Sequence, residues 1–313
     1  GLVVYDECHM CSAPMINSTL YMMQAGVRLG FTASLLHETN EKKVQSSLRG
    51  VGPLTGLEFM LGPVLCEIHP RTLVADKNLA KVQRVRVKCG KGENSQFLAF
   101  MNQMSVCKTK AQTYALSARK LQACALLVRL HRAMGHRIIV FAHRRLIVEY
   151  IALFLQLGDS WIHVDKSPAN RAAVLGNFKS GQNDTLVLGS VGNTGIDVPD
   201  ANVIIQFEWL PRARAAQVQR IGRIQRDKRK NAAEIMNTKG TTFYTLVNDR
   251  DDESYKELSS YLDSVMAVKE QEIELNTLEE RFPPQNSTLE EVSMLRLLRP
   301  LMFRFESTTS KIS

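Results

Sequence analysis

The sequence predicts an α/β protein with two parallel-sheet lobes, the first of which is truncated on its N-terminal side. Three observations predict this fold. Short continuous apolar runs, typical of strands covered on both faces, recur along the chain. Between residues 116 and 247 these runs alternate with stretches of helical length, as in a parallel sheet with helical crossovers. The chain also opens on such a run, residues 2–5, although a parallel core strand needs neighbours on both sides.

Length and composition agree with this fold and narrow the choice of partners. A chain of 313 residues can hold two α/β domains of ordinary size, and its 44% hydrophobic content excludes a disordered protein. The net charge of +9 favours a polyanionic partner. No apolar run approaches the roughly 18 residues of a membrane span. Six cysteines at irregular spacing indicate a reducing compartment rather than a disulfide framework.

The first lobe is expected over residues 1–75. Its predicted strands are residues 2–5, 27–32 and 62–67. Residues 49–63 are rich in Gly and Pro and predict an exposed connection or insertion. Because the chain begins directly on a core strand, we expect it to be a piece cut inside this lobe.

The second lobe is expected over residues 76–268, and a charged, amphipathic tail over residues 269–313. Ser167 and Pro168 fit the N-cap and the first position of a helix. The sheet pattern is expected to stop near Gln271. The predicted elements are strand 82–89, helix 116–134, strand 138–141, helix 146–155, strand 161–164, the helix after Ser167, strands 185–188 and 202–207, a helix from about 212, and strand 241–247.

Two carboxylates follow the first predicted strand. Open parallel sheets bind ligands at the carboxyl ends of their strands. Phosphoryl transfer needs a carboxylate on Mg²⁺ and a second group that orients the attacking water. Asp6 fits the metal role and Glu7 the water role. Taken alone, such a pair is more often a polar turn, but the Cys8-His9 that follows it and two later motifs favour the chemical interpretation.

Two weaker features lie nearby. Cys8 and Cys11 have CxxC spacing, but zinc needs four ligands and no second pair has fitting spacing, so two small thiols are the better interpretation. Thr32 and Ser34 form a hydroxyl-bearing turn after the second predicted strand. A simple strand end explains them equally well in isolation. Their place after the Asp-Glu motif predicts an element that couples the nucleotide and nucleic-acid surfaces.

A loop rich in Gly and hydroxyl residues, 189–197, follows the strand predicted at 185–188. Its backbone N–H groups and the hydroxyls of Ser190 and Thr194 can bind phosphate oxygens. Asp197 can accept a hydrogen bond from a ribose hydroxyl or hold an arginine. A simple left-handed turn remains the alternative.

Four residues on the helix predicted from about 212 form the third motif: Gln219, Arg220, Arg223 and Arg226. The arginines are spaced by three and therefore share a face. A solvated basic helix is the usual outcome of such a run, but Gly222 inside the helix costs about 1 kcal/mol and needs a reason. Arginine suits a transferring phosphate, and such residues can contribute about 10³–10⁵ in rate. The basic stretch 212–230 can also contact a nucleic-acid backbone.

These motifs, in this order, resemble the XPB-type DNA repair helicases of superfamily 2. The resemblance covers about residues 1–265 and extends beyond the motifs to five strings: Ala80-Lys81-Val82-Gln83, Ala123-Cys124, 138–142, 201–206 and 243–247. It implies two RecA-like lobes with ATP and Mg²⁺ in the cleft between them. It also implies double-stranded DNA as substrate, TFIIH-like subunits as partners, and work in transcription initiation and nucleotide excision repair in the nucleus.

The resemblance also implies roles for individual residues. Asp6 would hold magnesium and Glu7 the water, while His9 and Gln219 would couple the lobes. Arg223 and Arg226 would act as arginine fingers. The other transferred roles are nucleotide contact by Asp197 and Arg220, and nucleic-acid contact by Thr32, Ser34, Ser190 and Thr194.

Two departures from the family pattern affect the activity that we expect of this chain. His37-Glu38-Thr39 replaces an Arg-Glu-Asp element tied to DNA opening, which affects strand separation more than ATP hydrolysis. The printed chain has no GxxxxGK[ST] phosphate loop, so we expect the loop upstream and the chain alone to be inactive. Two alternatives stay open: a superfamily 2 motor of restriction or chromatin remodelling, and a non-catalytic scaffold that binds DNA or TFIIH-like partners.

Overall fold

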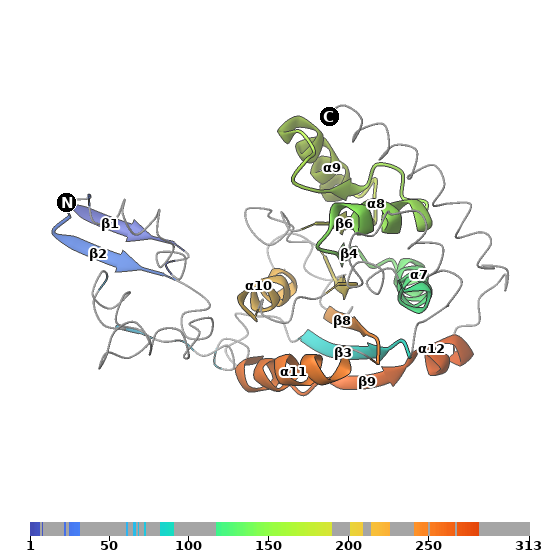
Figure 1. Ribbon diagram of the computed structural model, residues 1–313. Coiled ribbons are helices and arrows are strands. Elements are labelled where there is room, and N and C mark those ends of the chain that lie inside the picture. Colours follow the sequence, from blue (N-terminus) through green and yellow to red (C-terminus); the bar gives the residue numbers. More distant parts are fainter. Residues whose placement is uncertain are drawn as a thin grey trace, which may run out of the picture.

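The fold is seen in a computed structural model whose described residues form two separate parallel sheets (Figure 1). For residues 214–216, 223, 225, 252–254, 264–265 and 281 only the backbone is described. The described residues are 1–6, 8, 22, 25–31, 61, 65–66, 68, 72, 82–90, 117–189, 201–208, 214–225, 241–249, 251–266 and 268–281.

The N-terminal sheet pairs β1 (Leu2–Tyr5) with β2 (Val27–Gly30) in parallel, in the register Leu2↔Val27 to Tyr5↔Gly30. Both strands were predicted. The third expected strand, 62–67, is not supported where it can be checked: Leu65 and Cys66 are in no strand, and Leu65 is 80% exposed. The rest of that stretch, and all of the expected connection 49–63 except Leu61, lie outside the described residues.

The second sheet has seven parallel strands in the order β5-β6-β4-β7-β8-β3-β9. The central strands are continuous apolar runs because helices cover both of their faces. In β4, Ile138 and Val140 enter one core cluster while Ile139 and Phe141 enter the other. The strands are β3 (Val82–Lys88), β4 (Ile138–Phe141), β5 (Trp161–Ile162), β6 (Thr185–Leu188), β7 (Val203–Gln206), β8 (Thr241–Val247) and β9 (Gln271–Glu274).

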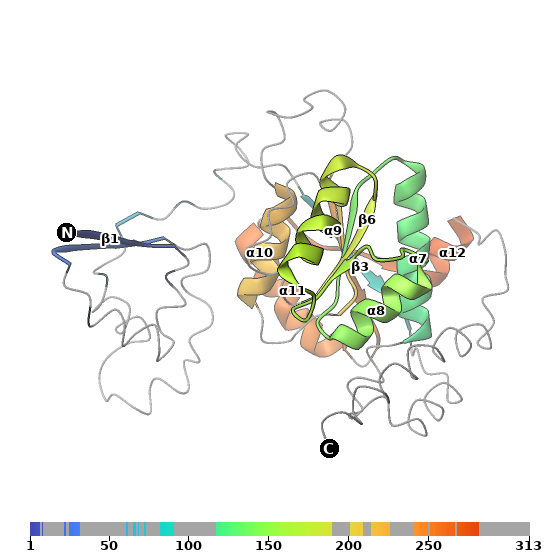
Figure 2. The same cartoon turned by 90° about the horizontal axis from the view of Figure 1, so that it is seen from above.

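Described helices cover both faces of this sheet, as Figure 2 shows. On one face lie α7 (Ala118–Ala133), α8 (Arg145–Phe154) and α12 (Leu275–Arg281). On the other lie α9 (Pro168–Ser180), α10 (Arg214–Gln225) and α11 (Asp252–Met266). This three-layer α/β arrangement confirms the predicted fold class. The domain boundaries after residues 75 and 268 stay predictions.

The predicted start of α9 is confirmed at the level of single atoms. The Ser167 side chain accepts a hydrogen bond from the Asn170 amide at 3.2 Å, and Pro168 is the first helical residue. Gly181, with φ of 83°, ends the helix in the left-handed conformation that favours glycine. The neighbouring β5 is shorter than predicted, because the chain leaves the sheet after Ile162 and Val164 is exposed.

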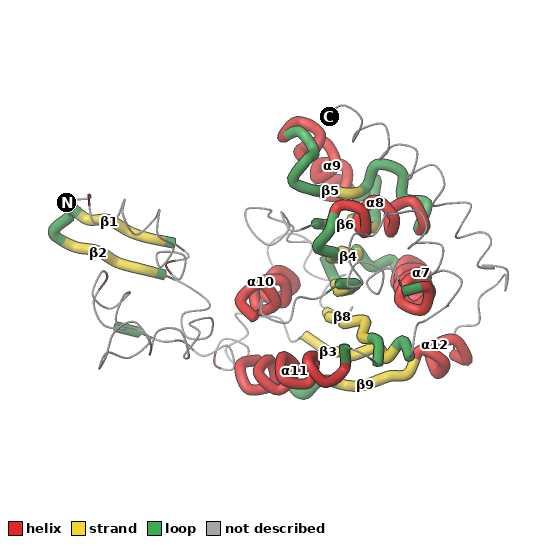
Figure 3. Tube along the Cα trace, in the orientation of Figure 1, coloured by secondary structure: helices red, strands yellow, loops and turns green. Residues whose placement is uncertain are grey.

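The expectation that the sheet pattern stops near Gln271 is wrong. There β9 pairs in parallel with β3 at the sheet edge, visible in Figure 3, and α12 buries Leu275 and Leu278 in the core. The sequence signal is weak because Gln271–Glu274 contains a single apolar residue. Ion pairs rather than apolar contacts join this strand to the sheet, because Arg86 and Lys88 on β3 both pair with Glu272 on β9. Residues 282–313 lie outside the described part.

A buried arginine anchors the same edge. The Arg84 side chain, 1% exposed, forms ion pairs with Asp263 at the end of α11 and with Glu270 just before β9, the latter at 3.3 Å. The Ser259 hydroxyl donates to Glu270 at 2.8 Å, and the Tyr255 hydroxyl also donates to Glu270. Because each carboxylate oxygen of Glu270 has a donor, the buried charges are compensated.

Arg84→Ala is therefore expected to lower the free energy of unfolding by about 3–5 kcal/mol, because it removes the buried cation of Asp263 and Glu270 and leaves Glu270 only the weaker contact with Arg86 at 4.0 Å. Arg132→Ala is the matched control. Arg132 pairs with Asp184 at 2.7 Å, but both side chains are more than a third exposed, so a loss below about 1 kcal/mol is expected. Urea denaturation measures both variants, and equal losses would contradict the proposed role of burial.

A buried histidine pair makes stability depend on pH. The Nδ1 atoms of His131 and His136 lie 2.8 Å apart, and His131 Nε2 lies 3.0 Å from the Tyr244 hydroxyl. Burial, and then the neighbouring His136, lower the pKa of His131 from 6.5 to about 4. Because the folded-state pKa is depressed, the neutral ring contributes fully above pH 6.5, and that stability is lost as the pH falls toward 4.

The expected loss over this pH window is about 2–3 kcal/mol. Chemical denaturation at a series of pH values measures it. His131→Gln keeps a donor and an acceptor but removes the titrating ring, so the variant should show a flatter dependence on pH. An unchanged slope in His131→Gln would assign the acid sensitivity to other groups.

Candidate nucleotide and nucleic-acid site

The candidate site lies where the strands end. Because all strands of the larger sheet run parallel, their carboxyl ends share one edge, and ligands of open α/β sheets bind at that edge. The predicted loop 189–197 starts there, after β6. The polar residues that follow the neighbouring strands are His143 and Arg144 after β4, His163 and Asp165 after β5, and Glu208 after β7.

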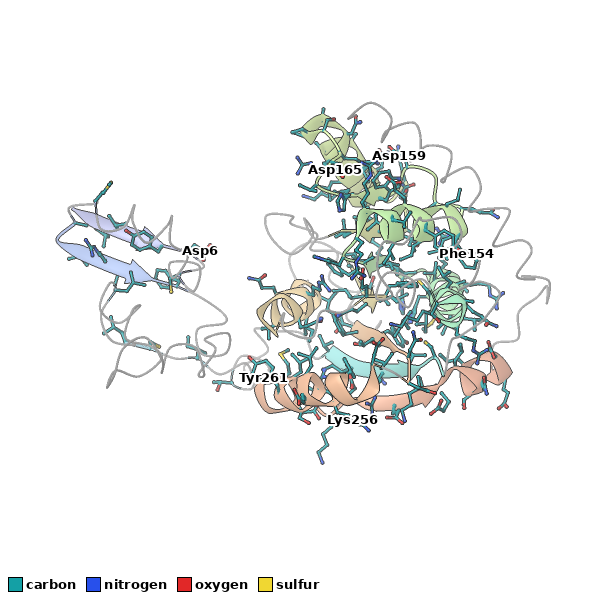
Figure 4. All side chains as sticks on the ribbon, in the orientation of Figure 1. Asp6, Phe154, Asp159, Asp165, Lys256 and Tyr261 are labelled. Carbon is teal, nitrogen blue, oxygen red and sulfur yellow. The ribbon has the colours of Figure 1, made fainter. Side chains whose placement is uncertain are left out.

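In the N-terminal sheet, Asp6 stands in the turn directly after β1, as predicted, and Figure 4 labels it at that strand end. The turn is tied to the end of β2. The Cys8 amide donates to the Phe31 carbonyl at 3.0 Å, and the Phe31 amide donates to the Tyr5 carbonyl at 2.8 Å. Glu7 and His9 lie outside the described residues, so their roles stay predictions.

Close packing of Cys8 explains a glycine in β2. A Cβ on Gly30 would come within 2.9 Å of Cys8 Sγ and within 2.7 Å of Leu61 Cδ1, so no larger residue fits. Cys8 is buried, in agreement with the interpretation as a structural thiol, and Cys11 lies outside the described part. Among the described residues no group of three or more His, Cys, Asp or Glu could hold a metal ion. Thr32 and Ser34 follow this contact but are not described.

Helix α10 carries the arginine motif and packs on the sheet through one face. Ile221 and Ile224 are fully buried in the core. Arg220 is 2% exposed, and its guanidinium lies 4.7 Å from the centre of the Phe141 ring at the end of β4. Sequence reasoning missed this burial, because helical spacing alone placed Arg220 with the other arginines. Gln219 is half-buried.

The other side of α10 is open at Gly222. No described atom lies within 4 Å of a Cβ built on this glycine. Packing among the described residues therefore does not explain why a helix interior carries glycine at a cost of about 1 kcal/mol. The side chain of Arg223 and all of Arg226 lie outside the described part, and so do Ser190, Thr194 and Asp197.

Glu208 joins two strand ends that sequence reasoning did not connect. Its carboxylate is buried and accepts hydrogen bonds from the amides of His143, at 2.9 Å, and Arg144, at 3.3 Å. It also forms an ion pair with the Arg144 guanidinium. A carboxylate suits this position because α8 begins at Arg145, and the N-terminus of a helix favours negative charge. The sequence signal was a glutamate directly after the strand predicted over residues 202–207.

His163 contacts the start of the loop after β6. The Gly189 amide donates to the Ile162 carbonyl at 2.8 Å, and a Cβ on Gly189 would lie 2.7 Å from Cδ2 of His163. His163 Nδ1 is 3.3 Å from a carboxylate oxygen of Asp165, and burial lowers the pKa of this histidine. No sequence pattern singled out His163, because a lone histidine after a strand is common.

No helix in the described part of the chain is both long and apolar enough to cross a membrane.

Comparison with known proteins identifies the family. Residues 73–260 match the family model described as the ERCC3/RAD25/XPB C-terminal helicase. The general transcription and DNA repair factor IIH helicase/translocase subunit XPB of Danio rerio is 32% identical over 251 residues, which cover 79% of this chain and 29% of that protein. The corresponding subunit XPB2 of Arabidopsis thaliana is 32% identical over 260 residues, covering 82% and 32%.

The chain thus spans about a third of the length of these relatives. In fold it is similar to the solved structure of S. cerevisiae Dbp5 bound to RNA and ADP BeF3, with a TM-score of 0.58. The identity is 14%, and the match covers 95% of this chain and 63% of the other, so this likeness concerns the RecA-like fold alone. Since the matched segment takes in more than half of its residues, the chain belongs to the ERCC3/RAD25/XPB C-terminal helicase family.

Proposed function

We propose that this chain is part of an ATP-dependent, double-stranded-DNA helicase or translocase of the XPB type. It acts in the nucleus, in a TFIIH-like complex, during transcription initiation and nucleotide excision repair. The observation that carries the proposal is the identity of about a third to factor IIH helicase/translocase subunits over 79–82% of the chain. The net charge of +9 agrees with a polyanionic substrate.

For the chemical step we propose that Asp6 holds Mg²⁺ and that Glu7 orients and deprotonates the attacking water. The position of Asp6 after a parallel strand supports this, and a carboxylate oxygen is a ligand that Mg²⁺ prefers. The bound ion supplies charge neutralisation to the ATP phosphates. Thr32 and Ser34 would contact DNA beside this turn, which the amide–carbonyl bonds of Cys8 and Phe31 hold against the end of β2.

The second sheet would meet the same ATP from α10 and from the loop after β6. We propose that Arg223 and Arg226 neutralise the developing phosphate charge, and that Gln219 and His9 couple the two lobes. Asp197 and Arg220 would contact the nucleotide, Arg220 from its buried position against Phe141. Ser190 and Thr194 would bind DNA phosphates.

Glu7→Gln in the full-length protein tests the catalytic assignment. The amide keeps the shape of the side chain but cannot take a proton, so DNA-stimulated hydrolysis is expected to fall by about 10²–10⁴. Binding of ATP and of DNA is expected to stay within about twofold. Turnover is measured by phosphate release and binding by fluorescence anisotropy. The 313-residue chain alone is the blank, and a Glu7→Gln protein with wild-type turnover would refute the assignment.

Gly222→Ala tests whether something approaches α10 closely during turnover. Alanine is the better helix former, so the variant should be more stable by up to about 1 kcal/mol. Turnover should nevertheless fall by about 10–100-fold, since the added methyl group displaces the approaching partner. Gly176→Ala in α9 is the matched control, because its Cβ likewise meets no described atom within 4 Å. Unchanged turnover in Gly222→Ala would remove the argument for close approach.

A further inference from the structure

A line of side-chain contacts runs along the carboxyl edge of the seven-stranded sheet and ends at Gly189. It begins on α8, where Arg145 Nε donates to Glu149 at 2.7 Å. Arg145 Nη1 donates to Asp165 at 3.2 Å, and the same carboxylate lies 3.3 Å from His163 Nδ1. Segments that follow three adjacent strands, β4, β5 and β6, are thereby connected. Figure 4 labels Asp165 within this region.

His163 packs directly beside Gly189 at the end of this line. His163 is 8% exposed, and its imidazole occupies the space where a Gly189 side chain would stand, 2.7 Å from the Cβ position. The backbone leaves little freedom on the other side, because the Ile162 carbonyl accepts the Gly189 amide at 2.8 Å and would lie 3.3 Å from that Cβ. The imidazole ring and the hydrogen bond between Gly189 and Ile162 together fix where Gly189 lies. The chain continues from Gly189 into residues 190–197.

We propose that His163 is a positioning residue: its ring fixes Gly189 and so sets the point from which the chain leaves β6 toward Ser190 and Thr194. The inference rests on the proposed function, in which these two hydroxyl residues bind DNA phosphates. Asp165 and Arg145 lie one step further back: Asp165 contacts the ring at Nδ1, and Arg145 pairs with Asp165. His163 itself contacts neither DNA nor ATP.

The surroundings of His163 differ from those of an ordinary core histidine. Its Nδ1 faces Asp165, whose side chain is half exposed, rather than a buried partner. The groups that bear on its charge come from α8 and from the segment after β5: Asp165, Arg145 and Glu149. Burial outweighs the carboxylates and lowers the pKa of the imidazole, so the ring that packs on Gly189 at neutral pH is the neutral one.

A double-mutant cycle between the two sites tests the proposal in the full-length protein. Gly189→Ala places a methyl group against the ring and is expected to raise the KM for DNA roughly tenfold, as if one good phosphate contact were lost. The kcat at saturating DNA should change by less than about threefold. His163→Ala removes the ring that fixes Gly189 and should raise the KM for DNA by a similar factor. The double variant should then have a KM no higher than that of either single variant, because both changes disturb the same contact.

Controls separate positioning from mere packing. Gly176→Ala should leave the KM for DNA unchanged. Asp165→Asn keeps the size of the side chain and weakens its pairing with Arg145, one step away from the ring, so a smaller rise in KM is expected. If Gly189→Ala does not fold, His163→Asn decides, with the same expected rise in KM and a cooperative thermal transition. A purely structural role would lower the active fraction at constant KM.

The outcomes distinguish the two proposals. A wild-type protein without DNA-stimulated ATP turnover would overturn the proposed function itself. Wild-type turnover together with KM defects of Gly189→Ala and His163→Ala that multiply in the double variant would overturn the positioning role alone. A double variant with no higher KM than either single variant, with Gly176→Ala unchanged, would establish that the ring acts through Gly189.

Discussion

Parallel pairing of the strands decides where the candidate residues of this chain can act, because parallel neighbours end at the same edge. Each described pair of strands is parallel, in the small N-terminal sheet and in the seven-stranded one. Asp6 therefore stands at the carboxyl end of β1, and the segments that carry Arg144, His163 and Glu208 meet at one edge of the larger sheet. This arrangement requires that both sheet faces be covered. Apolar side chains on the central strands pack against helices on either side, which meets this requirement.

Where a strand or turn has few buried apolar residues, ion pairs and hydrogen bonds to carboxylates keep it in place. The edge strand β9 exposes most of its side chains, and its pairing with β3 is accompanied by ion pairs of Arg86 and Lys88 with Glu272. At the carboxyl ends of the central strands, the Glu208 carboxylate accepts hydrogen bonds from the amides of His143 and Arg144, just before α8. Such contacts depend on geometry in three dimensions, since the partners are 64 or more residues apart in sequence.

The sequence alone predicts elements that depend on local apolar runs, but not contacts between residues that are distant in sequence. Strands β4, β6 and β8 were predicted to the residue, because a buried parallel strand is a local apolar run, and the start of α9 was predicted from the Ser-Pro cap. The strand Gln271–Glu274 was missed because one apolar residue carries no periodicity. In the candidate site, motifs placed Asp6 and Gln219 on the right elements. The burial of Arg220 and the contacts of Glu208 and His163 were not predictable, because each involves a residue that is distant in sequence.

Two glycines show how a structure separates the needs of the fold from those of function. At Gly189 the space for a side chain is already taken by His163, so packing within the lobe explains the glycine. At Gly222 no described atom takes that space, and alanine would suit the helix better by about 1 kcal/mol. Because no described residue explains the glycine at position 222, we expect a group outside the described residues to approach α10 at this point. Since Gly222 directly precedes Arg223, that group would arrive beside the arginine proposed to meet the phosphates of ATP, and the glycine would set how closely the two can come together.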